Sequence, residues 1–249
     1  GADISTLRYA RTGAAPLTAE LAARFTKLFG LHIYETYGMT EMVGTSTVTP
    51  PGLKREAGCV GLRQPYSQMR VVALDEQGGA SDRVQSVGQS GMVQFKAPNV
   101  FAGYLNPEDN HHAFSPDGWL NTGDLGYIDD QECLHLSGRA KDLIIRGGHN
   151  IDPRVIEDAL DSHPAVQTSA AVGAPDDYAG ELPVAYVTLV PGAKVQESEL
   201  LDWVRERVDE PPARPRWVQI LPAMPLTNVG KIYKPELREL AKQTMLQAK

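Results

Sequence analysis

The hydrophobic pattern near the start of the chain predicts one helix followed by a short strand. Apolar side chains recur at helical spacing at Leu17, Leu21, Phe25 and Leu28. Thr18 can cap the amino terminus of this helix, and Gly30 can end it. The apolar residues 31–34 then favour a strand. Residues 37–41, Tyr-Gly-Met-Thr-Glu, lose this periodicity, so we expect them on a loop whose glycine lets the backbone approach a ligand.

The middle of the chain changes to short strands separated by turns. Runs typical of half-buried strands cover residues 69–74, 92–96, 126–129 and 132–136. Turn-forming residues, such as Gly78 and Gly79, separate these runs. We therefore expect a β-rich subdomain that begins near residue 60 and ends near residue 140.

Helices and strands alternate again beyond residue 151. The expected elements are a helix opened by Asp152 and Pro153, strands near residue 170 and at 184–190, a helix at 198–208, a strand at 217–221 and a helix opened by Pro235. This alternation predicts a compact α/β domain of about 100 residues, within the usual domain range. The fold class that follows is α+β, divided into residues 1–140 and 141–249.

Composition and charge exclude several classes of protein. The 249 residues are 42% hydrophobic and 22% charged, which is ordinary for a globular chain of one or two domains. The net charge is -7 and the 24 Lys and Arg residues are scattered, which does not favour a nucleic-acid groove. No apolar run approaches the roughly 20 residues of a membrane span, and the chain does not start with the regions of a signal peptide. We expect a cytoplasmic protein with no membrane span and no nucleic-acid partner.

The cysteines and histidines do not form a recognisable metal or disulfide pattern. Cys59 and Cys133 lie far apart and make no Cys-x-x-Cys pair, so we expect small residues in or near strands and no structural disulfide. His111 and His112 are adjacent, and adjacent side chains do not face one another on a helix. We therefore expect these histidines in a surface loop rather than at a metal.

Three separated segments combine glycine with hydroxyl, carboxylate or guanidinium groups. They are residues 37–41, residues 119–124 (Trp-Leu-Asn-Thr-Gly-Asp) and residues 138–142 (Gly-Arg-Ala-Lys-Asp). An aromatic ring can stack on a base, a carboxylate can accept hydrogen bonds from ribose hydroxyls, and a guanidinium can reach phosphate oxygens. Taken singly, the segments also fit a carboxylate in a first helical turn, a tight turn and a solvated loop.

Together with two later segments, these residues resemble the signature series of the adenylate-forming superfamily. The later segments are residues 147–151 (Gly-Gly-His-Asn-Ile) and 225–232 (Pro-Leu-Thr-Asn-Val-Gly-Lys-Ile), and all five occur in the family's order. The superfamily includes acyl-CoA synthetases, amino-acid adenylation domains and firefly luciferase. The resemblance runs from residue 12 almost to the end of the chain. It implies that residues 1–140 are the carboxyl-terminal part of the large AMP-binding domain, and that residues 141–249 are the small mobile domain.

The resemblance assigns the adenine side of a nucleotide site. Gly13, Ala14 and Ala15 match the strip that lines the adenine and the acyl pocket. Tyr37 matches the aromatic residue that stacks on adenine, and Gly38 follows it where the backbone passes close to the nucleotide. We therefore expect these five residues to contact ATP.

The resemblance also assigns the phosphate and ribose contacts. Thr40 matches the residue that contacts the phosphate, and Glu41 matches the carboxylate that binds Mg²⁺, a cation that prefers oxygen ligands. Asp124 matches the ribose-binding aspartate, and Arg139 matches an arginine that also contacts the nucleotide. Thr40 and Glu41 are therefore expected to act in catalysis.

Four further residues match parts of the family that move between its two half-reactions. Lys231 matches the catalytic lysine that bridges the carboxylate and the α-phosphate, although its local sequence alone would suggest a surface lysine. Lys141 matches the hinge about which the small domain rotates. Gly147 and Gly148 match the glycine-rich stretch that lets the pantetheine arm of CoA pass.

The activity implied by the resemblance is that of an ATP-dependent acyl-CoA synthetase. Such an enzyme activates a small carboxylic acid as acyl-AMP and transfers the acyl group to CoA. Residues 37–41 and the Asn-Ile-x-Pro continuation at 150–153 are similar to fatty-acid and aryl-acid ligases. Two alternatives remain open, namely a ligase that loads a carrier protein and a non-catalytic module that binds a nucleotide or a partner.

The family's phosphate loop, which is rich in serine, threonine and glycine, has no counterpart in these residues. We therefore expect the chain to lack the amino-terminal half of the enzyme and to be inactive alone. Asp152 and Val155 also depart from common family residues, but both lie outside the nucleotide motifs.

Overall fold

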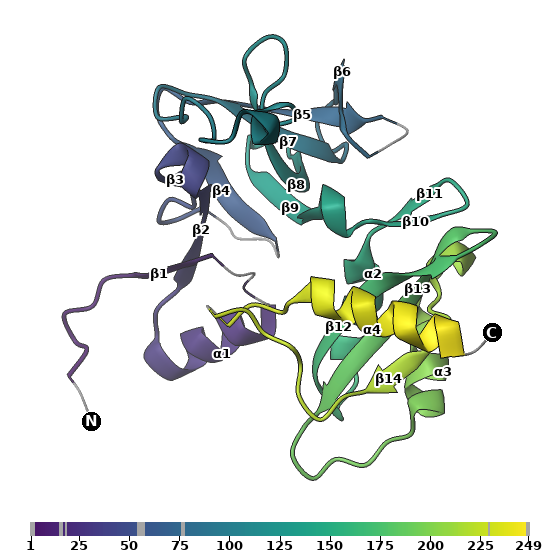
Figure 1. The fold of residues 1–249 in the computed structure, drawn as a ribbon. Helices are drawn as coiled ribbons and strands as arrows, with labels where there is room; N and C mark the ends of the chain where they lie inside the picture. The colour runs from purple at the N-terminus through teal and green to yellow at the C-terminus, as the bar shows by residue number, and fades with distance from the viewer. Residues whose placement is uncertain are drawn as a thin grey trace. The chain divides into compact units, whose positions relative to one another are not determined.

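The computed structural model describes residues 3–14, 17, 19–53, 58–75, 78–228 and 230–247. The chain forms two compact units, Gly1–Ala140 and Lys141–Lys249. In Figure 1 the colours run from purple to teal over the strands of the first unit and on to yellow over the second, because each unit is a continuous stretch of chain. Within the described residues, no helix is both long and apolar enough to cross a membrane.

Within its described residues, the first unit is built on a nine-stranded sheet with one α-helix. Its elements are β1 (Ala10–Gly13), α1 (Ala19–Phe29), β2 (Ile33–Met39), β3 (Gly44–Val48), β4 (Cys59–Arg63), β5 (Gln68–Leu74), β6 (Ala80–Val84), β7 (Gly91–Lys96), β8 (Leu120–Ile128) and β9 (Leu134–Arg139). The strand order is β1-β2-β3-β4-β9-β8-β7-β5-β6. Only the described pair β1 and β2 is parallel, and the other neighbours in this order are antiparallel. The expected β-rich region therefore forms, and it shares strand β4 with the strands that come before it.

The predicted first helix is confirmed, and its end follows from one glycine. Gly30 adopts a φ of +64°, and its N–H donates to the carbonyl of Thr26 at 2.9 Å. A left-handed residue that satisfies a late carbonyl is a common way to end a helix. The proposed N-cap, Thr18, lies outside the described residues.

The prediction that residues 37–41 form a loop is wrong. Tyr37 to Met39 form the end of β2, and Thr40–Met42 form a short 3₁₀ helix, η1. The reason is tertiary pairing: Gly38 pairs with Thr45 on β3, and a Cβ at position 38 would lie 1.5 Å from the carbonyl oxygen of Gly44. Gly38 is therefore explained by strand packing, which a local turn signal does not reveal.

The second unit is a small three-layer domain. Its elements are β10 (Ile144–Arg146), β11 (His149–Ile151), α2 (Pro153–Asp161), β12 (Val166–Asp176), β13 (Gly180–Leu189), α3 (Glu197–Arg207), β14 (Val218–Ile220) and α4 (Lys234–Gln247). The sheet order is β11-β10-β13-β12, and β14 pairs with β13 in parallel. The helix predicted to open at Asp152 is confirmed, because the Asp152 side chain accepts from the N–H of Arg154.

Two apolar clusters cover opposite faces of this second sheet. On β12, Ala171 belongs to a cluster with residues of α2 and α3, whereas Ala170 and Val172 belong to a cluster with Leu237 of α4. This division follows from the alternation of side chains along a strand. Figure 1 shows α4 lying along the sheet, in agreement with its cluster.

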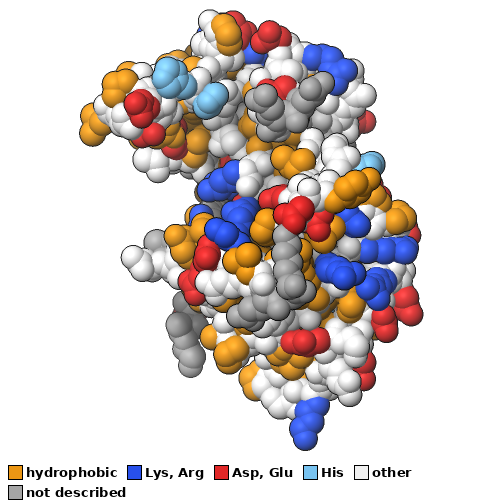
Figure 2. Space-filling model, turned by 45° about the vertical axis from the view of Figure 1, so that its right-hand side comes forward, with side chains coloured by type: hydrophobic (Ala, Val, Ile, Leu, Met, Phe, Trp, Pro, Cys, Tyr) orange, Lys and Arg blue, Asp and Glu red, His pale blue; other side chains and the backbone are white. Residues whose placement is uncertain are grey.

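The prediction that the two cysteines form no disulfide is also wrong. Cys59 and Cys133 form a disulfide although 74 residues separate them. The antiparallel pairing of β4 with β9 brings them together, since Cys59 pairs with His135 and Cys133 directly precedes β9. His111 and His112 are exposed in a turn, as expected. Figure 2 shows acidic and basic side chains interspersed over the visible face, which fits the scattered charges of the sequence.

Candidate active site

Tyr37, Asp124 and Arg139, which are far apart in sequence, form one hydrogen-bonded group in the first unit. The Tyr37 hydroxyl donates to Oδ2 of Asp124 at 2.6 Å. Nε of Arg139 lies 2.9 Å from Oδ1 of the same carboxylate. Tyr37 lies on β2, whereas Asp124 and Arg139 are opposite partners on β8 and β9. The first unit therefore brings three of the expected nucleotide contacts together.

The Asp124 carboxylate is buried and held in a fixed position. Its side chain is 8% exposed, whereas that of Arg139 is 53% exposed. The backbone N–H of Asp124 donates to Oγ1 of Thr122 at 3.0 Å, and that hydroxyl donates to the carbonyl of Val93 at 2.8 Å. A carboxylate can accept about four hydrogen bonds, so the two contacts to Tyr37 and Arg139 leave capacity for ribose hydroxyls.

The charge of Asp124 also affects Tyr37. Burial raises the pKa of the Tyr37 hydroxyl well above its usual value, and the adjacent Asp124 carboxylate, which would repel a phenolate, raises it further. Tyr37 therefore remains a neutral hydrogen-bond donor. Its ring lies 6.4 Å from the ring of Phe95, tilted by 34°, so one side of the aromatic residue is packed against the core.

Thr40 and Glu41 occupy the short 3₁₀ helix that follows β2. Glu41 Oε1 accepts a hydrogen bond from the Tyr104 hydroxyl at 2.5 Å, and its carbonyl accepts from the N–H of Phe101 at 2.8 Å. The bond to Glu41 raises the pKa of Tyr104 to about 12. Thr40 is exposed and Glu41 half-buried, so both can reach a ligand from solvent. Tyr104 was not expected from the sequence, since it is 63 residues from Glu41 and no local pattern marks it.

The backbone around this helix is strained at one residue. Val43 adopts a φ of +56° and donates its N–H to the carbonyl of Thr40 at 3.0 Å. A β-branched residue in the left-handed region is unfavourable and is often found at functional sites. The turn fixes the direction of the chain directly after the Thr40 and Glu41 side chains.

The strip at Gly13 and Ala14 lies at the end of the edge strand β1. Gly13 pairs with Thr36, the residue before Tyr37, and a Cβ at position 13 would lie 2.7 Å from the Thr36 hydroxyl oxygen. Ala14 adopts a φ of +68°. Both residues are exposed, and Ala15 lies outside the described residues. Two of the three strip residues therefore lie beside the strand that carries Tyr37.

The expected hinge residue begins the second unit. Lys141 lies in the short 3₁₀ helix η3 (Ala140–Asp142), and its side chain is exposed. Its carbonyl accepts from Nη2 of Arg238 at 3.0 Å, and the same nitrogen lies 2.8 Å from Oδ1 of Asp142. Arg238 of α4 thus binds two consecutive residues at the start of the unit. No feature of the sequence pointed to Arg238.

Gly147 and Gly148 form the two-residue turn between β10 and β11. Their φ angles are +55° and +85°, values typical of a type I′ hairpin turn. No atom of the described residues lies within 4 Å of a Cβ built at either position. The turn is therefore exposed as well as dependent on glycine, which leaves room for a ligand to approach its backbone.

Lys231 lies in a tight turn before α4. Its N–H donates to Oγ1 of Thr227 at 3.1 Å, and its carbonyl accepts from the N–H of Thr227 at 2.7 Å. Leu226 and Ile232 form an isolated antiparallel bridge around this turn. The Lys231 side chain is exposed, so the backbone is fixed while the ammonium group projects into solvent.

Two family models match this chain. The model for the AMP-binding enzyme covers residues 1–105, and the model for the AMP-binding enzyme C-terminal domain covers residues 155–231. Marinolic acid–CoA ligase from Pseudoalteromonas sp. is 43% identical over 236 residues, which are 95% of this chain and 36% of that relative.

Solved structures agree with these matches. MatB from Rhodopseudomonas palustris with ATP bound has a TM-score of 0.86 and 34% identity, over 94% of this chain and 46% of that one. The o-succinylbenzoate coenzyme A synthetase MenE from Bacillus subtilis, in complex with ATP and a magnesium ion, has a TM-score of 0.77 and 30% identity, over 93% of this chain and 46% of that one. The chain thus spans less than half the length of these three proteins.

Proposed function

We propose a function from the premise that this chain belongs to the adenylate-forming superfamily and is of the CoA-ligase type. The chain supplies the nucleotide contacts and the hinge of an ATP-dependent acyl-CoA synthetase. The enzyme would activate a carboxylic acid as acyl-AMP and pass the acyl group to CoA. The observation that carries the proposal is the Tyr37–Asp124–Arg139 group, which unites residues of three strands.

In this proposal, the group binds the nucleoside part of ATP. Asp124 would accept hydrogen bonds from the ribose hydroxyls through its remaining lone pairs. Arg139, which is half-exposed and already anchored on Asp124, would direct its other guanidinium N–H groups to the nucleotide. The ring of Tyr37 would stack on adenine beside Gly13, Ala14, Ala15 and Gly38.

The residues around Glu41 also fit a magnesium ion. Mg²⁺ is bound in proteins through one or two carboxylates together with substrate phosphates and water. Glu41 offers one half-buried carboxylate, oriented by Tyr104, and the exposed Thr40 hydroxyl lies next to it in the chain. When bound, the ion would neutralise phosphate charge. Thr40 would donate to a phosphate oxygen, and Glu41 would hold the ion beside it.

Adenylation requires a positive group at the reacting phosphorus. The carboxylate oxygen of the acid would form a bond to the α-phosphorus, while the bond to the pyrophosphate oxygen breaks. Lys231 would place its ammonium between the substrate carboxylate and the α-phosphate, where negative charge concentrates. Its hydrogen-bonded backbone and exposed side chain suit this role.

Thioester formation would use a different surface of the second unit. The CoA thiol would lose its proton, its sulfur would bond to the acyl carbon, and AMP would leave with the bonding electrons of the mixed anhydride. Rotation about Lys141 would withdraw Lys231 and present the Gly147–Gly148 turn to the pantetheine arm. The open space around both glycines supports this assignment.

We further propose that a second polypeptide segment, the amino-terminal half of the ligase, supplies the phosphate loop and most of the acyl pocket. The lengths of the relatives support this, since 249 residues match less than half of each. ATP and CoA are cytoplasmic metabolites, so we place the enzyme in the cytoplasm.

Half-reaction assays test the proposed function. The chain joined to the amino-terminal half of a related CoA ligase should exchange pyrophosphate into ATP when a suitable carboxylic acid is present, and should form acyl-CoA when CoA is added. A panel of aliphatic and aryl acids is needed. The proposal fails if this fusion binds AMP but catalyses neither half-reaction with any acid, or if the acyl group goes only to a phosphopantetheinylated carrier protein.

A further inference from the structure

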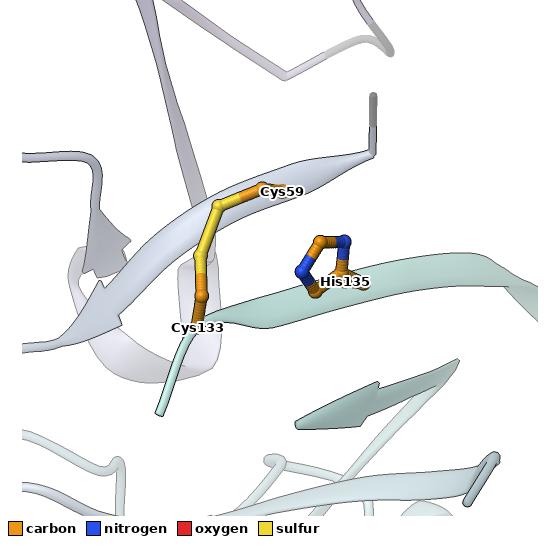
Figure 3. Close-up of side chains that lie close together, drawn as sticks. All are labelled: Cys59, Cys133 and His135. Carbon is orange, nitrogen blue, oxygen red and sulfur yellow. A yellow bond between two sulfur atoms is a disulfide. The ribbon is translucent and has the colours of Figure 1, made fainter. Parts of the chain in front are cut away.

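A buried cluster of potential metal ligands lies outside the proposed nucleotide contacts. Cys59, Cys133 and His135 each offer one ligand atom, and these atoms lie within 4.8 Å of one another. The three residues are 2%, 2% and 3% exposed. Figure 3 shows the His135 ring beside the two linked sulfur atoms, with Cys59 on β4 and His135 on β9. The first unit therefore isolates two sulfurs and an imidazole from solvent.

Strand pairing places these residues together. Cys59 on β4 and His135 on β9 are directly opposite partners, so their side chains lie on the same side of the sheet. Cys133 lies two residues before His135, and its N–H donates to Oδ1 of Asp129 at 2.8 Å. The β4–β9 pair and the turn at Asp129 therefore hold the three residues together whether the two cysteines are oxidised or reduced.

The two ring nitrogens of His135 differ in their contacts: one has a carboxylate partner and the other has none among the described residues. Nε2 of His135 lies 2.8 Å from Oδ2 of Asp129, and the ring stacks on Tyr127 at 4.6 Å with an interplanar angle of 3°. Nδ1 is buried and has no hydrogen-bond partner in the part of the chain that the structure describes. A buried nitrogen without a partner is costly. A carboxylate that orients a histidine is a common companion of a metal ligand.

The chemistry of the cluster selects one class of cation. Two thiolates and one imidazole are ligands for zinc and similar borderline-soft ions, whereas Mg²⁺ prefers oxygen. The disulfide has no thiolate to offer, so it must first be reduced. A dithiol supplies the two electrons and two protons, becomes a disulfide itself, and leaves two Cys thiols; a divalent ion then replaces the two thiol protons.

We propose that reduction of the Cys59–Cys133 disulfide opens a buried site for a zinc-like divalent cation, held by both thiolates and by a ring nitrogen of His135, with Asp129 orienting the ring. In a tetrahedral zinc site the two sulfurs are about 3.8 Å apart, which follows from zinc–sulfur bonds of about 2.3 Å. The ligand atoms are already within 4.8 Å, so side-chain rotation of the cysteines can complete the geometry. Cysteine pairs of cytosolic proteins are more often metal-binding than structural disulfides.

Cobalt titration of the purified chain tests this site. The chain contains two cysteines, so a sulfur-to-cobalt charge-transfer band in the near ultraviolet can arise only from this pair. After reduction and removal of the reductant, we expect one Co²⁺ per chain, with this band and with visible bands of tetrahedral intensity. The oxidised chain should bind at least 100-fold more weakly. Zn²⁺ should displace Co²⁺, and Mg²⁺ should not.

Variants decide whether the three residues form the site. The double change Cys59→Ser and Cys133→Ser should abolish the charge-transfer band, and His135→Gln should weaken Co²⁺ binding at least tenfold. Asp129→Asn should weaken binding less than His135→Gln, and His111→Gln, at an exposed histidine, should leave it unchanged. Far-ultraviolet circular dichroism confirms folding of each variant. The proposal is wrong if the reduced chain shows no charge-transfer band, if the oxidised chain binds as tightly, or if folded His135→Gln binds as the unaltered chain does.

Discussion

Arg139 and Asp124 face one another across the β8–β9 pair, with Nε of Arg139 2.9 Å from Oδ1 of Asp124. The pair joins a half-exposed guanidinium to a buried carboxylate, so Asp124 is neutralised before any nucleotide binds. In the proposed function, the remaining lone pairs of this carboxylate accept hydrogen bonds from the uncharged ribose hydroxyls.

Asp124→Asn should weaken ATP binding to the fused ligase by at least tenfold. The amide removes the charge that orders Arg139 and replaces one acceptor oxygen with a donor that faces the Tyr37 hydroxyl or Arg139. The KM for ATP from pyrophosphate exchange measures the effect, with folding checked by circular dichroism. Asp130→Asn, at an exposed turn, is the matched control. An unchanged KM in the Asp124 variant would remove this carboxylate from the site.

Tyr37→Phe should distinguish the contribution of the Tyr37 hydroxyl from that of its aromatic ring. The change removes one hydrogen bond to a charged partner, and such bonds contribute about 1.5–3 kcal/mol to the free energy of unfolding. The ring remains for stacking, so the KM for ATP should rise only severalfold. Tyr37→Ala should raise it further. Denaturant unfolding measures the stability of both variants, and pyrophosphate exchange measures their KM for ATP. Equal KM values for Tyr37→Phe and Tyr37→Ala would argue against stacking on adenine.

The sequence predicted the local elements of this chain better than its long-range contacts. The first helix, the Asp152 cap and the short strands each depend on residues close together in sequence. The Tyr37–Asp124 hydrogen bond and the Cys59–Cys133 disulfide join residues separated by 87 and 74 positions. Spacing rules contain no information about such pairs, because only the strand order of the sheet determines them.

The resemblance to a family predicted some residues that are distant in sequence but close in space, although it did not explain what brings them together. Family motifs indicated Tyr37, Asp124 and Arg139 as residues of one site, and the structure brings these three together. They did not indicate Tyr104 or Arg238, which orient Glu41 and the Lys141 segment. Supporting residues of this kind lie outside short motifs, so a sequence reading finds the proposed ligand contacts before their partners.

Tyr104 should titrate later than an ordinary tyrosine, because its bond to Glu41 raises its pKa to about 12. The phenol is protonated in the folded chain where an unfolded chain, with a pKa near 10, is already losing its proton. The contribution to stability is therefore complete below about pH 10 and is lost as the pH rises toward 12. When phenolate formation is followed by absorbance, the Tyr104→Phe variant should show one late-titrating tyrosine fewer than the unaltered chain. Loss of a group that titrates near pH 10 instead would contradict the Glu41 contact.

Arg238→Ala should affect thioester formation more than adenylation, if Lys141 is the hinge. The guanidinium binds the Lys141 carbonyl and the Asp142 carboxylate, so its loss frees the segment at the start of the second unit. We expect pyrophosphate exchange to change little while acyl-CoA formation falls severalfold. Lys242→Ala, an exposed change on the same helix, is the control. Equal loss of both rates would indicate a general structural role for Arg238.

Lys231→Ala should selectively remove the adenylation half-reaction. Its ammonium is the one proposed to stabilise charge at the α-phosphate, and loss of a positioned charge-stabilising donor typically costs roughly 10²- to 10³-fold in rate. Its backbone turn is held by Thr227 and does not depend on the side chain, so the variant should remain folded. Pyrophosphate exchange measures adenylation, and acyl-CoA formation from synthetic acyl-AMP measures the second step. Lys231→Arg should recover little activity, because a planar guanidinium differs in shape and reach from a compact ammonium. If Lys231→Ala slowed both half-reactions equally, Lys231 would be a residue of the fold and not of the chemistry.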